Sequence, residues 1–405
     1  MKYLVVIPDG MADRSIEALG GKTPMEAADK PCMDTLCRQS LCGTVLNVPE
    51  GMVPESDTAN LAILSYNPKI YSKGRSPLEA MSMGLTMEDD DTAIRCNLVT
   101  LSEEEPCYED KTMLDHSADE ISTEEADQLV AALNEGMGSS DWHLYTGVSY
   151  RHCLLWRGAS QTYPFMRPHD ILGQKIRDFL PKEENGGGDF LQFQKNGYEI
   201  LKNHPVNIAR KEKGLRPANS PWLWSPGGKP SLPSFREKWG LSGAIISAVD
   251  LIKGIGICAG MQVIEVEGAT GNFHTNYSGK AKAAIDAYET GADFVYIHVE
   301  APDECGHRGE IENKVRSIEK IDQLILRPVY EYLQKAGEPF KVLVLPDHPT
   351  PIELRTHTSD YVPFFLFDSA HLRKGTAVFS EENGRRCDTV IHDGSTLLDL
   401  MIKEV

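Results

Sequence analysis

The chain has 405 residues, of which 41% are hydrophobic and 25% are charged. This ordinary globular composition excludes a wholly disordered, collagenous or coiled-coil protein, and the length allows two or three domains. The 60 acidic and 41 basic side chains give a net charge of −19. A surface this acidic repels nucleic-acid phosphates and anionic lipid, so we expect neither nucleic acid nor a membrane as a partner.

Continuous apolar runs predict the strands of a buried sheet. The first covers residues 3–7 and is ended by Pro8-Asp9-Gly10, and the pattern returns at 294–299 and 342–345. Apolar runs without alternation are typical of parallel strands buried on both faces. Residues 361–367 predict a further strand, which Pro363 places at an edge of the sheet.

Helical patterns at 280–290 and 311–334 separate these strands and indicate an α/β core. The middle of the chain is more polar, with a helix candidate at 123–135 and short strands at 93–98 and 152–156. We therefore predict a discontinuous core with a mostly parallel sheet flanked by helices, and a smaller inserted α+β domain. The predicted bounds are 1–85 and 225–405 for the core and 86–224 for the insert, with three consecutive domains as the alternative.

The nine cysteines are an odd number without a Cys-x-x-Cys pair, which argues against a disulfide framework. This usage predicts a reducing, cytoplasmic location. We expect no signal peptide, because only a short apolar run follows Lys2. No apolar run approaches the roughly 20 residues that cross a bilayer.

Carboxylates and imidazoles follow the predicted strands at the point where each strand ends. In an open parallel sheet this edge is where ligands bind. Singly, each residue has a simpler interpretation as a turn residue or a surface pair, but six ionisable groups buried together would be costly unless paired or bound to metal. Mixed carboxylate and imidazole ligands suit Mn²⁺ or Zn²⁺ better than Ca²⁺. The candidate ligands are Asp9, Asp303, His307, Asp347, His348 and His357.

Ser56 stands at or near the start of a predicted helix and has two interpretations. It could be an N-cap, although Ala59 stands where a capping box would want Glu or Gln. It could instead be a nucleophile, because free amide donors and the positive end of the helix dipole favour an incoming phosphate. A nearby metal would also stabilise its alkoxide.

Five motifs carry a resemblance to a known family. They are Pro8-Asp9-Gly10, Ser56-Asp-Thr-Ala-Asn60, Ala301-Pro-Asp-Glu-Cys-Gly-His307, Pro346-Asp347-His348 and Thr356-His357-Thr358. In order and spacing, and over essentially its whole length, the chain resembles the archaeal-type cofactor-independent phosphoglycerate mutases of the alkaline phosphatase superfamily. The resemblance implies an alkaline phosphatase-like core, two divalent metal ions, an inserted substrate-binding domain that closes as a lid, and no requirement for 2,3-bisphosphoglycerate. Manganese is the favoured metal, with zinc or magnesium as alternatives.

The resemblance also implies residue roles. Ser56 would attack the phosphate of a small phosphorylated metabolite, form phosphoserine and return the group to the neighbouring hydroxyl, which interconverts 3-phosphoglycerate and 2-phosphoglycerate. Lys280 would contact the phosphate. One metal would be held by Asp9, Ser56, Asp347 and His348, and the other by Asp303, His307 and His357. Further substrate contacts are expected from Asp57, Asn60, Arg151, His169 and Arg210.

One segment departs from the family pattern. Typical members grip the substrate carboxylate with an arginine-rich stretch of the insert, but residues 109–120 here contain five acidic residues and only Lys111 and His116 as basic candidates. Relatives with this variant insert have been proposed to act as homoserine kinases, and Asp115 or Asp119 could pair with the ammonium group of homoserine. Arginines elsewhere in the insert could compensate instead. An alternative from another class is a non-catalytic metal-binding scaffold.

Overall fold

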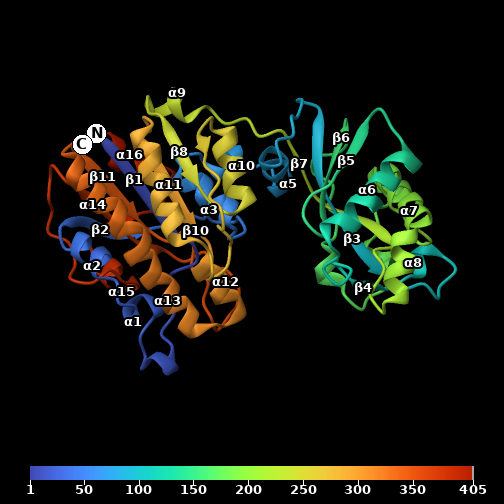
Figure 1. Cartoon of the computed structure of the whole chain (residues 1–405), viewed down its shortest axis with the longest axis horizontal. Coiled ribbons are helices and arrows are strands. Elements are labelled where there is room, and N and C mark those ends of the chain that lie inside the picture. Colours follow the sequence, from blue (N-terminus) through green and yellow to red (C-terminus); the bar gives the residue numbers. More distant parts are fainter. Residues whose placement is uncertain (404–405) are drawn as a thin grey trace. The chain divides into compact units, whose positions relative to one another are not determined.

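The computed structural model describes residues 1–403 and divides into two compact units (Figure 1). Unit 1 comprises Met1–Ser72 and Ser231–Val405, and unit 2 comprises Lys73–Pro230. The insert therefore begins before helix α5 (Arg75–Ser82) rather than after it, because α5 packs on strands β3 and β7 of unit 2. The role of this insert as a lid stays a prediction.

Unit 1 is built on an eight-stranded sheet in the order β13-β2-β12-β11-β1-β10-β8-β9. At its centre β1 (Lys2–Pro8) pairs in parallel with β10 (Phe294–Val299) and with β11 (Phe340–Val344). The sheet continues in parallel from β10 to β8 (Gly243–Ile246) and β9 (Gln262–Val263). Apolar side chains along β1, β10 and β11 are buried, as their unbroken sequence patterns predict. The predicted α/β core with a mostly parallel sheet is confirmed.

The predicted edge position of residues 361–367 is wrong. Strand β12 (Val362–Asp368) lies inside the sheet, antiparallel both to β11 and to β2 (Ser40–Val45), and β13 (Thr389–Ile391) completes that side. Pro363 is tolerated because the ladder with β11 begins only at Phe365, so the amide proton that proline lacks is not needed there.

Helices cover the sheet of unit 1, with α11 (Tyr277–Glu289), α13 (Ile311–Ile321) and α14 (Arg327–Ala336) in the foreground of Figure 1. The helix predicted at 311–334 is interrupted by a π-turn over Asp322–Leu326. Pro328 provides the reason, since a proline removes a helical hydrogen bond and crowds the preceding turn.

Unit 2 holds a five-stranded antiparallel sheet in which β3 (Asp91–Leu101) pairs with three other strands. Its partners are β4 (Met113–Asp115), β6 (Arg151–Arg157), which continues to β5 (Trp142–Tyr145), and β7 (Ser220–Gly228). Helices α6 (Thr123–Met137) and α7 (Gly188–Leu201) share a core with the Ile94, Cys96 and Leu98 face of β3. By alternation, Arg95 and Asn97 point to the opposite face.

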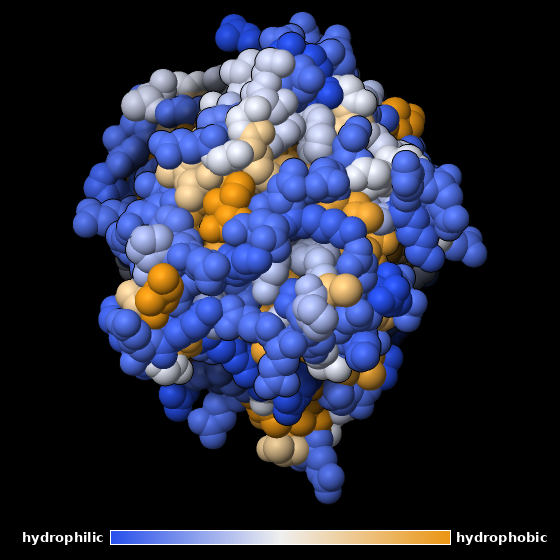
Figure 2. Space-filling view, turned by 90° about the vertical axis from the view of Figure 1, so that its right-hand side faces the viewer, coloured by the Kyte–Doolittle hydropathy of each residue, from blue (hydrophilic) through white to orange (hydrophobic). Residues whose placement is uncertain are grey.

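The face drawn in Figure 2 is largely hydrophilic, with only small apolar areas. Among the described residues, we find no helix with the length and apolar character to span a membrane.

Candidate metal centre

The carboxyl ends of three neighbouring strands in unit 1 bring the predicted ligands together. Asp9 directly follows β1, and Asp347 follows β11. After β10, helix α12 (Ala301–Arg308) presents Asp303 and His307 one turn apart. Because β10, β1 and β11 are parallel neighbours, their carboxyl ends meet at one edge of the sheet.

Asp303, His307 and His357 are the first candidate ligand group, and Asp303 and His357 also lie close to His348. The Nε2 atoms of the two histidines are 2.9 Å apart, and each is 3.3 Å from an oxygen of Asp303. The Nδ1 atom of His307 is 2.9 Å from the carbonyl oxygen of Arg355, and that of His357 is 2.6 Å from the carbonyl oxygen of Pro54. A carbonyl only accepts, so both Nδ1 atoms carry protons, and in the neutral rings both Nε2 lone pairs face each other and the carboxylate.

These spacings fit a cation. Two ligands about 2.1 Å from one ion at a tetrahedral angle lie about 3.4 Å apart, close to the separations between these ligand atoms. Although burial opposes its ionisation, hydrogen bonds with His307 and His357 hold the pKa of Asp303 well below its ordinary value. The hydrogen bond with Asp303 in turn raises the pKa of His307 to about 9. Without a metal, protons on the histidines neutralise the carboxylate of Asp303. A divalent ion bound by the same atoms would take their place.

Asp9, Asp347, His348 and Ser56 form the second ligand group. The Nε2 atom of His348 is 3.2 Å from Ser56 Oγ, 3.7 Å from Asp9 Oδ1 and 3.6 Å from Asp347 Oδ2. Burial raises the pKa of Asp9 well above its ordinary value, and repulsion from Asp347 adds to the effect. Asp9 Oδ1 is buried without a hydrogen-bond partner. Such an oxygen is costly to bury unless a cation compensates it, so this group also fits a metal ion.

Ser56 is the first residue of α3 (Ser56–Ile63), and Glu55 is its N-cap. The N-cap interpretation of Ser56 is therefore wrong, and its hydroxyl is directed at His348 instead. This position leaves Ser56 Oγ at the helix N-terminus, where amide groups and the dipole favour an anion.

Asp347 is fixed from several sides. Its oxygens accept hydrogen bonds from the backbone amides of Gly10 and His348 and from the side-chain amide of Asn60, 3.1, 2.9 and 2.9 Å away. Asn60 is fully buried, and its carbonyl oxygen accepts from the Tyr296 hydroxyl. Asn60 was expected as a substrate contact. In the structure its side-chain amide holds Asp347 in place.

His298 is a site residue that the sequence analysis missed. It is fully buried in β10, and its Nε2 atom lies 3.0 Å from Asp9 Oδ2. Burial lowers the pKa of His298 to about 4, so the ring is neutral. Asp9, His298 and Asp347 could together hold a cation. The available signal was a histidine at the carboxyl end of an otherwise apolar strand, next to the turn that carries the ligands.

Lys280 contacts the backbone of this histidine. Its Nζ donates to the carbonyl oxygen of His298 at 3.0 Å, and burial lowers the pKa of Lys280 to about 8. Asp57, the other predicted contact in unit 1, is buried in the first turn of α3.

The three substrate contacts expected in unit 2 differ in their surroundings. Arg210 is buried and bound to Glu125 and to the carbonyl oxygens of Ala118 and Arg216, so it is structural. His169 and Arg151 are exposed and belong to one chain of ring contacts. We call this chain the histidine–arginine surface, formed by Arg95, His116, Tyr150, Arg151, His169 and Trp224.

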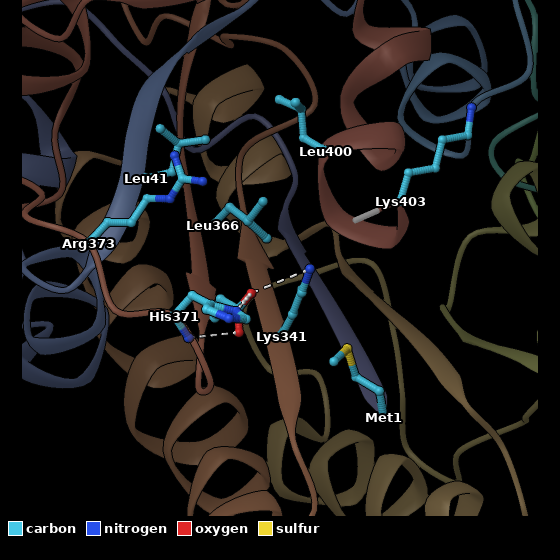
Figure 3. Close-up of a pocket in the computed structure, with 9 residues that line it drawn as sticks. Met1, Leu41, Lys341, Leu366, His371, Arg373, Leu400 and Lys403 are labelled. Atoms are coloured by element: carbon cyan, nitrogen blue, oxygen red, sulfur yellow. Dashed lines mark hydrogen bonds and ion pairs between the residues drawn. The ribbon is translucent and has the colours of Figure 1, made fainter. Parts of the chain in front are cut away.

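A separate cavity of about 560 Å³ lies at the opposite, amino end of the central strands of unit 1 (Figure 3). Met1 and Lys341 line it, and its carboxylate, Asp368, is paired with Lys341 and His371 at 3.4 Å each. It contains none of the predicted ligands and is no part of the metal centre.

Comparison with known proteins places this geometry in a family. Residues 37–207 match the family model of 2,3-bisphosphoglycerate-independent phosphoglycerate mutase. Proteins of that name from Methanosarcina barkeri and Methanothrix thermoacetophila are 44% and 43% identical, over 100% and 99% of this chain and 100% of each relative.

Two solved structures extend the comparison. The structure of a Pyrococcus horikoshii protein covers 99% of this chain and 96% of its own, with a TM-score of 0.81 and 28% identity. A cofactor-independent phosphoglycerate mutase from Thermoplasma acidophilum shares the fold over 100% of this chain and 99% of its own, with a TM-score of 0.68 and 24% identity. The chain belongs to the family of 2,3-bisphosphoglycerate-independent phosphoglycerate mutases.

Proposed function

We propose that this protein interconverts 3-phosphoglycerate and 2-phosphoglycerate through a phosphoserine at Ser56, with two divalent metal ions, of which manganese is favoured. The observation that carries the proposal is the position of Ser56 Oγ at the N-terminus of α3, 3.2 Å from His348 Nε2 in the second ligand group. The names of the full-length relatives support the same reaction.

The metal ions would be held by the two ligand groups and would lower the charge barrier to attack on the phosphate. Ser56 Oγ forms a bond to phosphorus as the bond from phosphorus to the substrate oxygen breaks, and the departing oxygen takes up the proton that the serine hydroxyl loses. The phosphoryl group then returns to the neighbouring hydroxyl and Ser56 is regenerated, so no bisphosphoglycerate is required. Asp347, His298 and Asn60 hold the surrounding groups in place, in agreement with phosphoryl transfer that depends on positioning and electrostatics.

The substrate carboxylate needs local positive charge, and we propose that the histidine–arginine surface of unit 2 supplies it. No ion pair is found for Arg151 among the described residues, and its guanidinium lies over the Tyr150 ring at 5.4 Å. The ring centroids of His116 and His169 lie 6.0 Å apart, and His116 Nδ1 is 3.8 Å from Asp115 Oδ1. Burial lowers the pKa of His169, so Arg151 is the main source of positive charge. Arginine and histidine donors of this kind suit a carboxylate.

The homoserine alternative loses its main support. Asp115 is 3.1 Å from Arg216 Nη1 and accepts from two groups of Ser117. Asp119 accepts from the Arg216 backbone amide at 2.8 Å. Both carboxylates therefore have partners inside unit 2, which weakens the case for an ammonium group at this place.

A paired assay tests the proposal. The metal-stripped protein, reloaded with Mn²⁺, is assayed for 3-phosphoglycerate isomerisation without bisphosphoglycerate and, in parallel, for ATP-dependent phosphorylation of homoserine. We expect isomerisation only, lost in Ser56→Ala and weakened mainly in KM in Arg151→Gln, with Arg157→Gln on the same strand as a control. Homoserine phosphorylation would overturn the substrate assignment, and Mn²⁺ binding without any turnover would favour the scaffold.

A further inference from the structure

Thr350 contacts one ligand from each of the two groups, although no substrate or metal role follows from its sequence position. It is fully buried. Its Oγ1 hydroxyl donates to Asp303 Oδ1 in the first group, and the same oxygen is 3.4 Å from His348 Nδ1 in the second. A single hydroxyl therefore joins the groups.

The direction of these hydrogen bonds follows from the chemistry of the partners. An ionised carboxylate only accepts, so Thr350 uses its one proton on Asp303. Its oxygen then offers only lone pairs to His348, so the proton of the His348 ring must sit on Nδ1. The lone pair of His348 consequently lies on Nε2, the atom 3.2 Å from Ser56 Oγ.

The backbone of Thr350 is held by a buried ion pair. Its carbonyl oxygen accepts from Lys314 Nζ at 2.8 Å, and the same ammonium is 2.8 Å from Asp13 Oδ2. Lys314 is fully buried and Asp13 nearly so. A side chain on Gly306 would place its Cβ 2.6 Å from the Thr350 carbonyl oxygen, so a glycine permits the close approach of α12. These contacts leave the hydroxyl little freedom to turn away from its partners.

We propose that Thr350 is a positioning residue that prepares both ligand groups for metal before any ion arrives. It keeps His348 in the tautomer whose Nε2 can bind a cation, and it holds the Asp303 carboxylate in place by donating to Oδ1. The inference rests on the proposed metal dependence. It adds that the two groups are coupled through one hydroxyl, so loss of that hydroxyl weakens metal binding in both.

The test compares Thr350→Val, which keeps the shape but removes the hydroxyl, with Thr350→Ser, which restores the hydroxyl. Thr92→Val serves as a control, because Thr92 is equally buried and its Oγ1 donates to the Ala159 carbonyl in unit 2. Binding of Mn²⁺ to the metal-stripped proteins is measured by calorimetry. We expect both binding steps to weaken 10- to 100-fold in Thr350→Val, as is typical for supporting groups. Thr350→Ser should stay within about threefold of the wild type, and Thr92→Val should match it.

A second readout needs no metal. Nitrogen chemical shifts of ¹⁵N-histidine-labelled, metal-stripped protein report the tautomer of His348, assigned by comparison with His348→Gln. We expect the Nδ1–H tautomer in the wild type and Thr350→Ser, and a mixture in Thr350→Val. The Nε2–H tautomer in the wild type, or unchanged Mn²⁺ affinity in a folded Thr350→Val, would overturn the proposal. If the wild type bound no Mn²⁺, the proposed function would fail while the tautomer still tested Thr350.

Discussion

Replacement of Gly10 by alanine gives the sharpest test of how tightly the two ligand groups are packed. Gly10 has φ +60°, in the left-handed region that favours glycine. A Cβ at this position would lie 2.5 Å from Thr350 Oγ1, 2.6 Å from Asp303 Oδ1 and 2.8 Å from Asp303 Cα. The last of these atoms belongs to the backbone of α12 and cannot turn away, so helix and ligand must shift together.

The expected cost has two parts. An alanine in the left-handed conformation costs about 1–2 kcal/mol, and overpacking of a filled site costs about 1–3 kcal/mol. Gly10→Ala should therefore lower the free energy of unfolding by about 2–5 kcal/mol. Gly20→Ala is the matched control, because Gly20 has φ +68° in the same unit but nothing lies within 4 Å of its Cβ position. It should lose only the conformational part, about 1–2 kcal/mol.

Urea denaturation followed by circular dichroism measures both variants, and Mn²⁺ titration measures the site. Displacement of Asp303 should weaken Mn²⁺ binding at least about 10-fold in Gly10→Ala and leave it unchanged in Gly20→Ala. Equal stability losses in the two variants, together with equal Mn²⁺ affinities, would show that the close approach of Gly10, Thr350 and Asp303 does not exist in solution.

Three further predictions concern other parts of unit 1. Ser56→Ala should abolish mutase turnover yet bind Mn²⁺ within about 10-fold of the wild type, since the other ligands remain; turnover in the variant would contradict a phosphoserine route. Lys314→Met should lower the free energy of unfolding, measured by urea denaturation, by about 3–5 kcal/mol, because it leaves the buried carboxylate of Asp13 without its ion pair. Lys282→Met on the surface should leave the denaturation midpoint nearly unchanged. Burial raises the pKa of Asp322 to about 6 from an ordinary 3.8, so the folded state binds the proton more tightly. Stability from this group is complete below pH 4 and is lost, by about 3 kcal/mol, as the pH rises through 6. Asp322→Asn should remove the contribution of this group to the slope of unfolding free energy against pH between pH 4 and 6. An unchanged slope would show that the carboxyl is not buried as described.

Much of the metal centre was predictable because it depends on strand order rather than on packing detail. A polar residue that directly follows a buried parallel strand must emerge at the carboxyl edge, so Asp9, Asp303 and Asp347 were predicted to meet without knowledge of any contact. His298 could be suspected only from its place near the carboxyl end of an apolar strand, and Thr350, in a loop, could not be found this way. The contacts of both with the ligands depend on side-chain direction.

The other differences have the same origin. Contacts between elements far apart in the sequence decide the direction of β12 and place α5 in unit 2. The amino-acid composition of these segments does not predict such contacts. Likewise, the acidic stretch at 109–120 misleads when it is examined alone. Glu109 pairs with Lys195, and Asp110 with Arg177, so much of its charge is neutralised by bases that lie far along the chain.

This local pairing reconciles a net charge of −19 with a proposed anionic substrate. Long-range attraction cannot bring phosphoglycerate to such a surface, and at physiological salt charges are screened beyond about 8 Å. What matters is the charge within that distance of the site. In unit 1 the buried carboxylates of Asp9, Asp303 and Asp347 favour the binding of divalent cations. Such ions would change the electrostatic potential at Ser56 from negative to positive. In unit 2 the carboxylate of Asp115 is paired with Arg216, whereas no ion pair is found for Arg151 among the described residues. Under the proposed function, the metal ions would supply the positive charge that the phosphate needs, and Arg151 would supply it for the carboxylate.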